Sequence, residues 1–82
     1  MPARLYPAEL TPAAEGGFVV SFPDIPEAIT RGENVEHALS EAADALDEAL
    51  IGRVNSGYRI PVPSRARQGQ YLIPVYLRKQ RS

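Results

Sequence analysis

The sequence contains no cysteine and no tryptophan, and it has a single histidine among its 82 residues. Without cysteine, neither a disulfide framework nor a thiolate zinc site can supplement a small hydrophobic core. A lone histidine also excludes a metal site built from histidines, and we expect His37 to be a solvated side chain. No hydrophobic run approaches the roughly 18 residues of a membrane span, and the N-terminus lacks the apolar segment of a secretory signal. We therefore expect a soluble cytoplasmic protein with no metal, no cofactor and no membrane contact.

Acidic residues are absent from residues 51–82, and this absence exposes a charge split that the net charge of −1 conceals. Residues 1–50 hold all ten acids and two arginines, a formal charge of −8, whereas residues 51–82 carry +7. Such a split favours ion pairing within one fold or between subunits, or two surfaces for two charged partners. A nucleic-acid role for the basic end is the alternative interpretation.

Two short strands are expected at the start of the chain. Residues 3–10 and 17–22 should pair in antiparallel fashion, because the loop between them is short. The dipeptide Gly16-Gly17 permits the positive φ that a tight turn requires. Pro7 interrupts the first run, which predicts an edge strand or a position whose N–H would face solvent.

Two prolines limit the second strand and lead into a third. Pro23 and Pro26 cannot donate ladder hydrogen bonds, so the second strand must end near Phe22. Residues 28–31 can form a brief third strand, closed by Gly32.

The spacing of apolar residues predicts a long helix over 35–55. Asn34 is a good N-cap, and Gly57 is placed to be the left-handed residue after the C-terminus. Apolar side chains at three- and four-residue steps define the inner face of this helix. They are Val35, Leu39, Ala42, Ala43, Leu46, Ala49 and Leu50.

The last strand is expected over residues 70–77, after an extended, proline-bearing linker over 58–69. Pro74 argues that this strand lies at an edge, and residues 78–82 should form a frayed tail. Together these expected elements give an α+β fold of order β-β-β-α-β, with one helix packed on one face of a small sheet. Because the other face and the edges stay uncovered, the architecture predicts a homo-oligomer (dimer or tetramer) or a docked partner.

Together these residues resemble the HicB antitoxin family, over about residues 4–77. The segments that carry the resemblance are Tyr6-Pro7-Ala8, Gly16-Gly17-Phe18-x-Val20-x-Phe22-Pro23-Asp24-x-Pro26, Thr30-x-Gly32-Glu33-Asn34, Ala38-Leu39 with Ala42 and Ala45-Leu46, Gly57, and Ile60-Pro61-x-Pro63-Ser64. The glycine–phenylalanine–proline segment at its fixed distance from the Ala-Leu helix is the specific part of this pattern.

The resemblance implies a partial ribonuclease-H-like fold and a protein that binds and neutralises a HicA-type toxin, a small ribonuclease that cleaves messenger RNA. Many family members also carry a C-terminal helix-turn-helix or ribbon-helix-helix domain that binds operator DNA. This sequence ends at Ser82, where such a domain would begin. We therefore expect a single domain over 1–82 with no DNA-binding domain, which puts operator binding in doubt.

Candidate catalytic groups are few. A ribonuclease-H-type site needs several carboxylates converging on two divalent metals, and only Glu9 and Asp24 lie in or next to expected strands. Asp24, between two prolines, is expected to accept backbone N–H bonds within its own turn. We therefore expect no enzyme, although a minimal metal-dependent ribonuclease is the third hypothesis.

Two charged groups are the candidate partner-binding residues. Glu41, Asp44 and Glu48 form an acidic helix face that could meet a toxin built to bind RNA, or could simply be solvated. Tyr58, Arg59, Arg65, Arg67, Tyr71 and Tyr76 form a basic and aromatic group that could contact protein, stack on RNA, or stay hydrated. The favoured hypothesis is an antitoxin acting by protein contact. The alternatives are a nucleic-acid-binding transcriptional regulator that uses the basic C-terminal third, or an orphan oligomeric interaction module.

Overall fold

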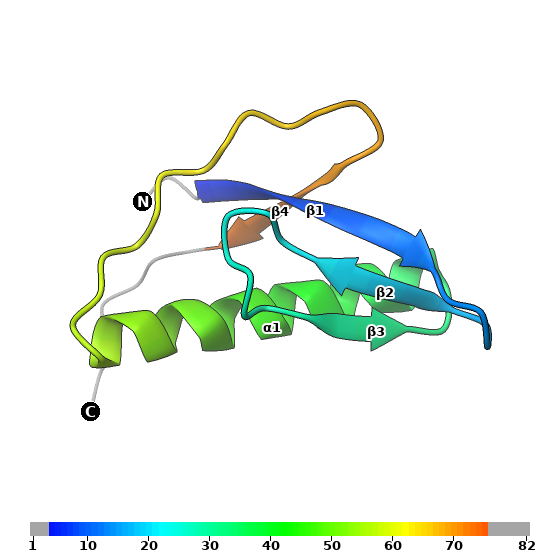
Figure 1. Ribbon diagram of the computed structural model, residues 1–82, viewed down its shortest axis with the longest axis horizontal. Coiled ribbons are helices and arrows are strands. Elements are labelled where there is room, and N and C mark those ends of the chain that lie inside the picture. The colour runs from blue at the N-terminus through cyan, green and yellow to red at the C-terminus, as the bar shows by residue number, and fades with distance from the viewer. Residues whose placement is uncertain (1–3, 76–82) are drawn as a thin grey trace.

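The computed structural model describes residues 4–75, which form an antiparallel sheet of four strands and a single helix (Figure 1). This confirms the expected α+β class and the expected order of elements. In chain order the elements are β1 (Arg4–Pro12), β2 (Phe18–Ser21), β3 (Thr30–Gly32), α1 (Val35–Asn55) and β4 (Tyr71–Val75). The expected residues 76–77 of the last strand and the tail 78–82 lie outside the described residues.

The strands are arranged in the order β3-β2-β1-β4, so β1 is central. Its two halves have different partners: residues 4–8 pair with β4, and residues 9–12 pair with β2. Pro7 therefore lies where β1 pairs with only one neighbour, although its side chain is buried rather than facing solvent. Pro74 lies on β4 at the end of the strand order, as expected for a proline on an edge strand.

Two strand boundaries differ from the sequence-based expectation by two residues, and the other described boundaries that differ do so by one residue. The first strand continues to Pro12 because the glycine turn brings Phe18 opposite that residue. The third strand begins at Thr30 rather than Ala28, because the Ala28 N–H donates to the Ile25 carbonyl in a turn (2.9 Å). Both differences arise from strand pairing and turn hydrogen bonds, which the local pattern of apolar residues does not determine.

The core lies between the sheet and α1. Its helical part is Ala38, Ala42, Leu46 and Leu50, and its remaining members are Tyr6, Ala8, Val20, Phe22, Ile25, Ala28, Ile73 and Val75. The prediction that Val35 belongs to the inner face of the helix is wrong, because this residue lies in the first turn and is 37% exposed. Ala38, which was not included, is fully buried there.

Gly32 lets β3 pack closely against α1, and Gly17 lets the turn between β1 and β2 pack closely against β3. A Cβ on Gly32 would lie 2.3 Å from the backbone N and Cα of Ala38, so the requirement at Gly32 is space. Gly17 has φ +77°, and a Cβ there would lie 2.6 Å from the Gly32 carbonyl. Gly16 also has positive φ (+105°), which confirms the expected glycine turn.

Both ends of α1 are capped as the sequence predicts. The side chain of Asn34 accepts a hydrogen bond from the backbone N–H of His37 (2.8 Å). At the other end Gly57 has φ +83°, and its N–H donates to Val54 (3.0 Å) while the Tyr58 N–H donates to Arg53 (2.8 Å). These two bonds form a Schellman motif, which satisfies carbonyls of the last turn.

Candidate interaction surfaces

The outward side of α1 is acidic. Because Ala38, Ala42, Leu46 and Leu50 face the sheet, the carboxylates of the helix lie on its other side, toward solvent. Glu36, Asp44, Asp47 and Glu48 are exposed, and Glu41 is partly exposed. Within residues 4–75, no carboxylate of α1 forms an ion pair with lysine or arginine. These carboxylates are placed to meet an external cation, and the partner-binding role expected for Glu41, Asp44 and Glu48 stays a prediction.

His37 lies on this side of α1 and is half exposed, as expected. Its Nε2 is 3.5 Å from a carboxylate oxygen of Glu41, and its Nδ1 accepts a hydrogen bond from the backbone N–H of Glu33 (3.0 Å). With the bond from the His37 N–H to Asn34, this makes a reciprocal cap at the start of the helix. Sequence reasoning missed this role; the signal is a side-chain acceptor three residues after the N-cap.

Residues 58–69 connect α1 to β4 without regular secondary structure, and we call this segment the strap. Hydrogen bonds to distant side chains hold its backbone at two places. The hydroxyl of Tyr6 donates to the carbonyl of Pro61 (2.6 Å). The N–H and hydroxyl of Ser64 donate to the two carboxylate oxygens of Asp24 (2.7 and 2.5 Å).

The Asp24–Ser64 contact corrects the expected role of Asp24. This carboxylate does accept a backbone N–H, but from a residue 40 positions away rather than from its own turn. Ser64 therefore bonds across the fold rather than within its own segment. Because Asp24 lies in the connection between β2 and β3, the contact joins that connection to the strap.

The strap carries the basic candidates. Arg59, Arg65 and Arg67 are exposed, and Tyr58 is 69% exposed. In the described part of the chain, none of these three arginines forms an ion pair. Tyr71 does not belong to this group: it lies opposite Ala8 in the β1–β4 pair, so it shares the helix-covered face of the sheet. The other tyrosine of the predicted group, Tyr76, lies outside the described residues.

The basic candidates follow the acidic helix along the chain, and the strap leads away from it. Figure 1 shows the strap leaving the C-terminal end of α1, rising along one side of the molecule and then running above β1. Of the described cations beyond residue 50, only Arg53 pairs with an acid, Glu27. Within residues 4–75, the predicted internal pairing of the two charge blocks is therefore limited to one contact, and the carboxylates of α1 and the arginines of the strap do not pair with each other.

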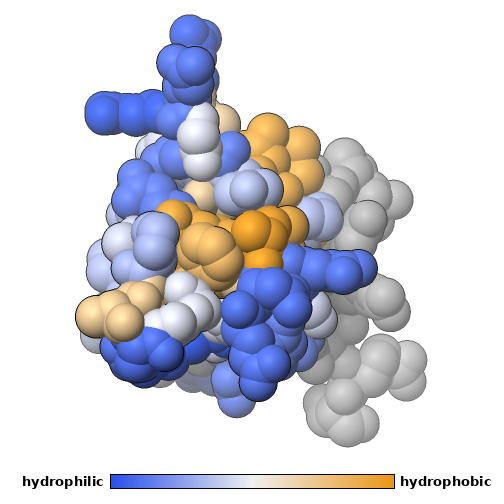
Figure 2. All heavy atoms as spheres, turned by 90° about the vertical axis from the view of Figure 1, so that its right-hand side faces the viewer, coloured by the Kyte–Doolittle hydropathy of each residue, from blue (hydrophilic) through white to orange (hydrophobic). Residues whose placement is uncertain are grey.

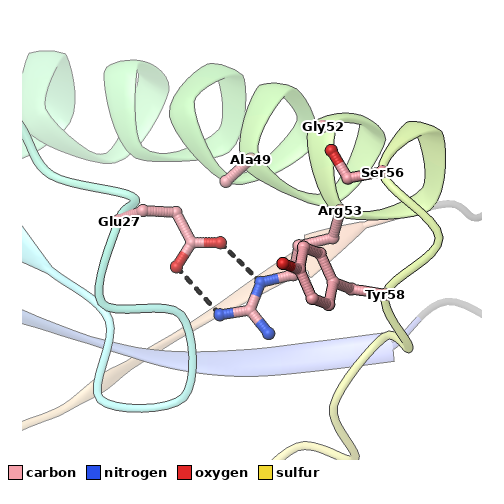
Figure 3. A pocket seen from close by; sticks show the side chains of 6 residues that line it. All are labelled: Glu27, Ala49, Gly52, Arg53, Ser56 and Tyr58. Carbon is pink, nitrogen blue, oxygen red and sulfur yellow. Dashed lines mark hydrogen bonds and ion pairs between the residues drawn. The ribbon is translucent and has the colours of Figure 1, made fainter.

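Arg53 and Glu27 join the last turn of α1 to the connection between β2 and β3 (Figure 3). Nε and one terminal nitrogen of Arg53 donate to the two oxygens of Glu27 (2.5 and 2.8 Å). The hydrogen bonds from Arg53 lower the pKa of Glu27 to about 2. The pair forms one wall of an open hollow of about 550 Å³, which Tyr58 also lines. Sequence reasoning did not identify this pair, whose members are 26 residues apart.

Hydrophobic side chains gather at one end of the molecule and are bordered by hydrophilic ones (Figure 2). The end of β1, the start of β2 and the first turns of α1 reach this end (Figure 1). They carry the partly buried Leu10, Phe18 and Leu39. An apolar centre with a charged border is the usual anatomy of a protein interface.

The two candidate catalytic carboxylates lie at the strap. Glu9 accepts a hydrogen bond from the side-chain amide of Gln70 (2.8 Å), and Asp24 is bonded to Ser64. Among residues 4–75, no group of three histidine, cysteine or acidic side chains is placed to hold a metal ion. No helix in that part of the chain is long and apolar enough to cross a membrane.

Comparisons with known proteins agree with the resemblance seen in the sequence. Residues 5–78 match the family described as "HicB_like antitoxin of bacterial toxin-antitoxin system". "Antitoxin HicB" of Escherichia coli strain K12 is 47% identical over 72 residues, which cover 88% of this chain and 52% of that relative. "Antitoxin HicB 1" of Photorhabdus laumondii is 44% identical over 70 residues, 85% of this chain and 45% of that relative. The chain thus spans about half the length of the curated relatives it matches.

Proposed function

This chain belongs to the HicB-like antitoxin family, and from that premise we propose that it binds and neutralises a HicA-type ribonuclease toxin. Neutralisation occurs by protein–protein contact and needs no catalysis by this chain. The partner is a small basic protein whose positive surface otherwise holds RNA phosphates.

The observation that carries this proposal is the outward side of α1, whose carboxylates pair with no lysine or arginine within residues 4–75. Glu41, Asp44 and Glu48 lie at three- and four-residue steps, so their charges are neighbours along one face. Such an arrangement is unfavourable in isolation, and a cationic partner would relieve it. An acidic face opposite an RNA-binding surface competes with phosphate and accelerates encounter.

The hydrophobic end of the molecule supplies the short-range part of the contact. The first turns of α1 reach this end (Figure 1), so a partner on the acidic side of the helix can reach apolar surface without crossing the sheet. Charge then sets the association rate, while burial of apolar side chains slows dissociation.

Charge reversal tests this assignment. The variant E41K/D44K/E48K should lower the association rate constant with the toxin encoded by the neighbouring gene by tenfold or more at low salt. The control R59Q/R65Q/R67Q neutralises three arginines of the strap and should leave that rate within about twofold. If E41K/D44K/E48K associated at the wild-type rate, the assignment would be contradicted. It would also be contradicted if the protein encoded by the neighbouring gene were neither basic nor toxic.

We also propose that the chain forms a homo-oligomer, a dimer or tetramer, through the sheet. In the described strands, β4 has a partner on one side only. On the face away from α1, Leu5 and Leu72 are 46% and 47% exposed. Light scattering of the wild type and of L5K/L72K tests this. A wild-type monomer at micromolar concentration would contradict it.

A further inference from the structure

The strap is the second charged surface of the molecule, and the proposed toxin contact does not use it. We propose that the strap binds single-stranded nucleic acid through its phosphate backbone. This inference is independent of the toxin contact, because it concerns the arginines of the strap rather than the carboxylates of α1.

The three arginines of the strap stand on fixed backbone. Arg59 is two residues from the Pro61 carbonyl that Tyr6 holds, and Arg65 follows Ser64, which Asp24 holds. The backbone N–H of Arg67 donates to the side-chain oxygen of Gln70 (2.7 Å), and the Gln70 N–H returns a bond to the Arg67 carbonyl (3.0 Å). Fixing the backbone in advance reduces the ordering cost of binding an extended ligand.

The local charge favours an anion. Arg4 adds a fourth cation, since its terminal nitrogen lies 3.5 Å from the Pro61 carbonyl. Two carboxylates approach the strap, those of Asp24 and Glu9, and both accept hydrogen bonds from neutral donors there. Four arginines against two carboxylates leave the surface positive.

The acidic side of α1 does not cancel this charge. The strap begins at the C-terminal end of α1, but its later part, yellow to orange in Figure 1, runs above β1, away from the helix. Charges further apart than about 8 Å are largely screened at physiological ionic strength. A polyanion at the strap therefore experiences mainly the arginines.

The shape of the strap favours a single strand over a duplex. An extended run of about ten residues reaches up to roughly 30 Å, and it offers neither a helix nor a ribbon to enter a groove. Tyr58 is 69% exposed beside Arg59, and Val62 is 80% exposed. Aromatic rings next to arginines hold unpaired bases by stacking, a mode that does not depend on sequence.

The test measures fluorescence anisotropy of a labelled 12-nucleotide oligouridine against the full chain, with oligothymidine and a 12-base-pair duplex as parallel probes. The wild type should retain the single strands, with a log–log salt slope near −2, about 0.7 per phosphate contacted for three contacts. Preference for oligouridine identifies RNA, and equal retention identifies any single strand. Absence of retention at 50 mM salt would overturn the proposal, and so would tighter binding of the duplex.

Variants assign the site. R59Q/R65Q/R67Q should weaken binding at least tenfold and flatten the salt slope, and Y58A should weaken it severalfold without changing that slope. The matched control R78Q/K79Q/R81Q removes the same charge elsewhere in the sequence and should have the smaller effect. Equal losses in both triple variants would overturn the assignment to the strap. Circular dichroism verifies folding, and E41K/D44K/E48K, which tests the toxin contact, should still bind the oligonucleotide.

Discussion

The outward side of α1 and the strap carry opposite charges, and they are held in place by different means. On α1, regular backbone hydrogen bonds and a buried stripe of alanine and leucine orient the carboxylates without further contacts. On the strap, a hydrogen bond donated by Tyr6 and one accepted by Asp24, both distant in the sequence, hold an irregular backbone. The helix surface should therefore survive most single changes, whereas the strap depends on a few side chains.

The largest loss of stability should come from a change at Gly32, where β3 packs against α1. Gly32→Ala would place a Cβ 2.3 Å from the backbone of Ala38, so strand and helix must move apart. We expect a loss of about 3 kcal/mol or more in the free energy of unfolding, much of a small domain's stability. Urea denaturation measures it. The control Gly52→Ala adds a Cβ with nothing within 4 Å and should stabilise the helix by about 0.5–1 kcal/mol. A neutral Gly32→Ala would contradict this packing.

Releasing the strap should cost less. Asp24→Ala removes the acceptor of both Ser64 bonds, and we expect a loss of about 1–2 kcal/mol. Limited proteolysis should then cleave within residues 58–69 more rapidly, while α1 stays protected. In a double-mutant cycle, Ser64→Ala should add little once Asp24 is replaced. Additive losses from the two substitutions would show that the contact does not hold the strap.

The cap of α1 should have an effect of about 1 kcal/mol. Asn34→Ala removes the acceptor for the His37 N–H at the start of the helix. Thermal unfolding measures the loss, and Ser40→Ala, on the exposed middle of the helix, is the control. Toxin association should stay near the wild-type rate, because the acidic side chains keep their places. A cap variant that is as stable as the control would contradict this role.

The smallest effect should be the pH dependence of the Glu27–Arg53 pair. Folding lowers the pKa of Glu27 from 4.5 to about 2, so the folded state releases this proton more readily than the unfolded state. The pair therefore stabilises the protein above pH 4.5, and this contribution disappears as the pH falls toward 2. Solvent exposure keeps it small. Glu27→Gln should flatten the acid limb of stability against pH, and Glu48→Gln should not; equal curves would contradict the assignment.

The helix could be predicted from sequence because its determinants are local. Asn34, Gly57 and the three- and four-residue spacing gave the observed bounds of 35–55. Val35 failed because periodicity gives the direction of a side chain but not whether another element covers it. The sequence alone also could not show which half of β1 pairs with which neighbour, because that depends on the strands that flank it.

The strap could not be predicted in the same way. Its arginines and tyrosine were identified by composition, but their separation from the acidic helix depends on the path between α1 and β4. Asp24 and Ser64 are 40 residues apart, and Glu27 and Arg53 are 26 apart. Nothing in the local sequence pairs such residues, since many acids and donors are chemically equivalent partners until the fold selects one.

The most direct test of two independent charged surfaces is the association rate constant with the neighbouring-gene toxin, measured for both triple variants at one salt concentration. Our account predicts a tenfold or larger decrease for E41K/D44K/E48K and a change within about twofold for R59Q/R65Q/R67Q. A decrease confined to the strap variant, or equal decreases in both, would contradict it.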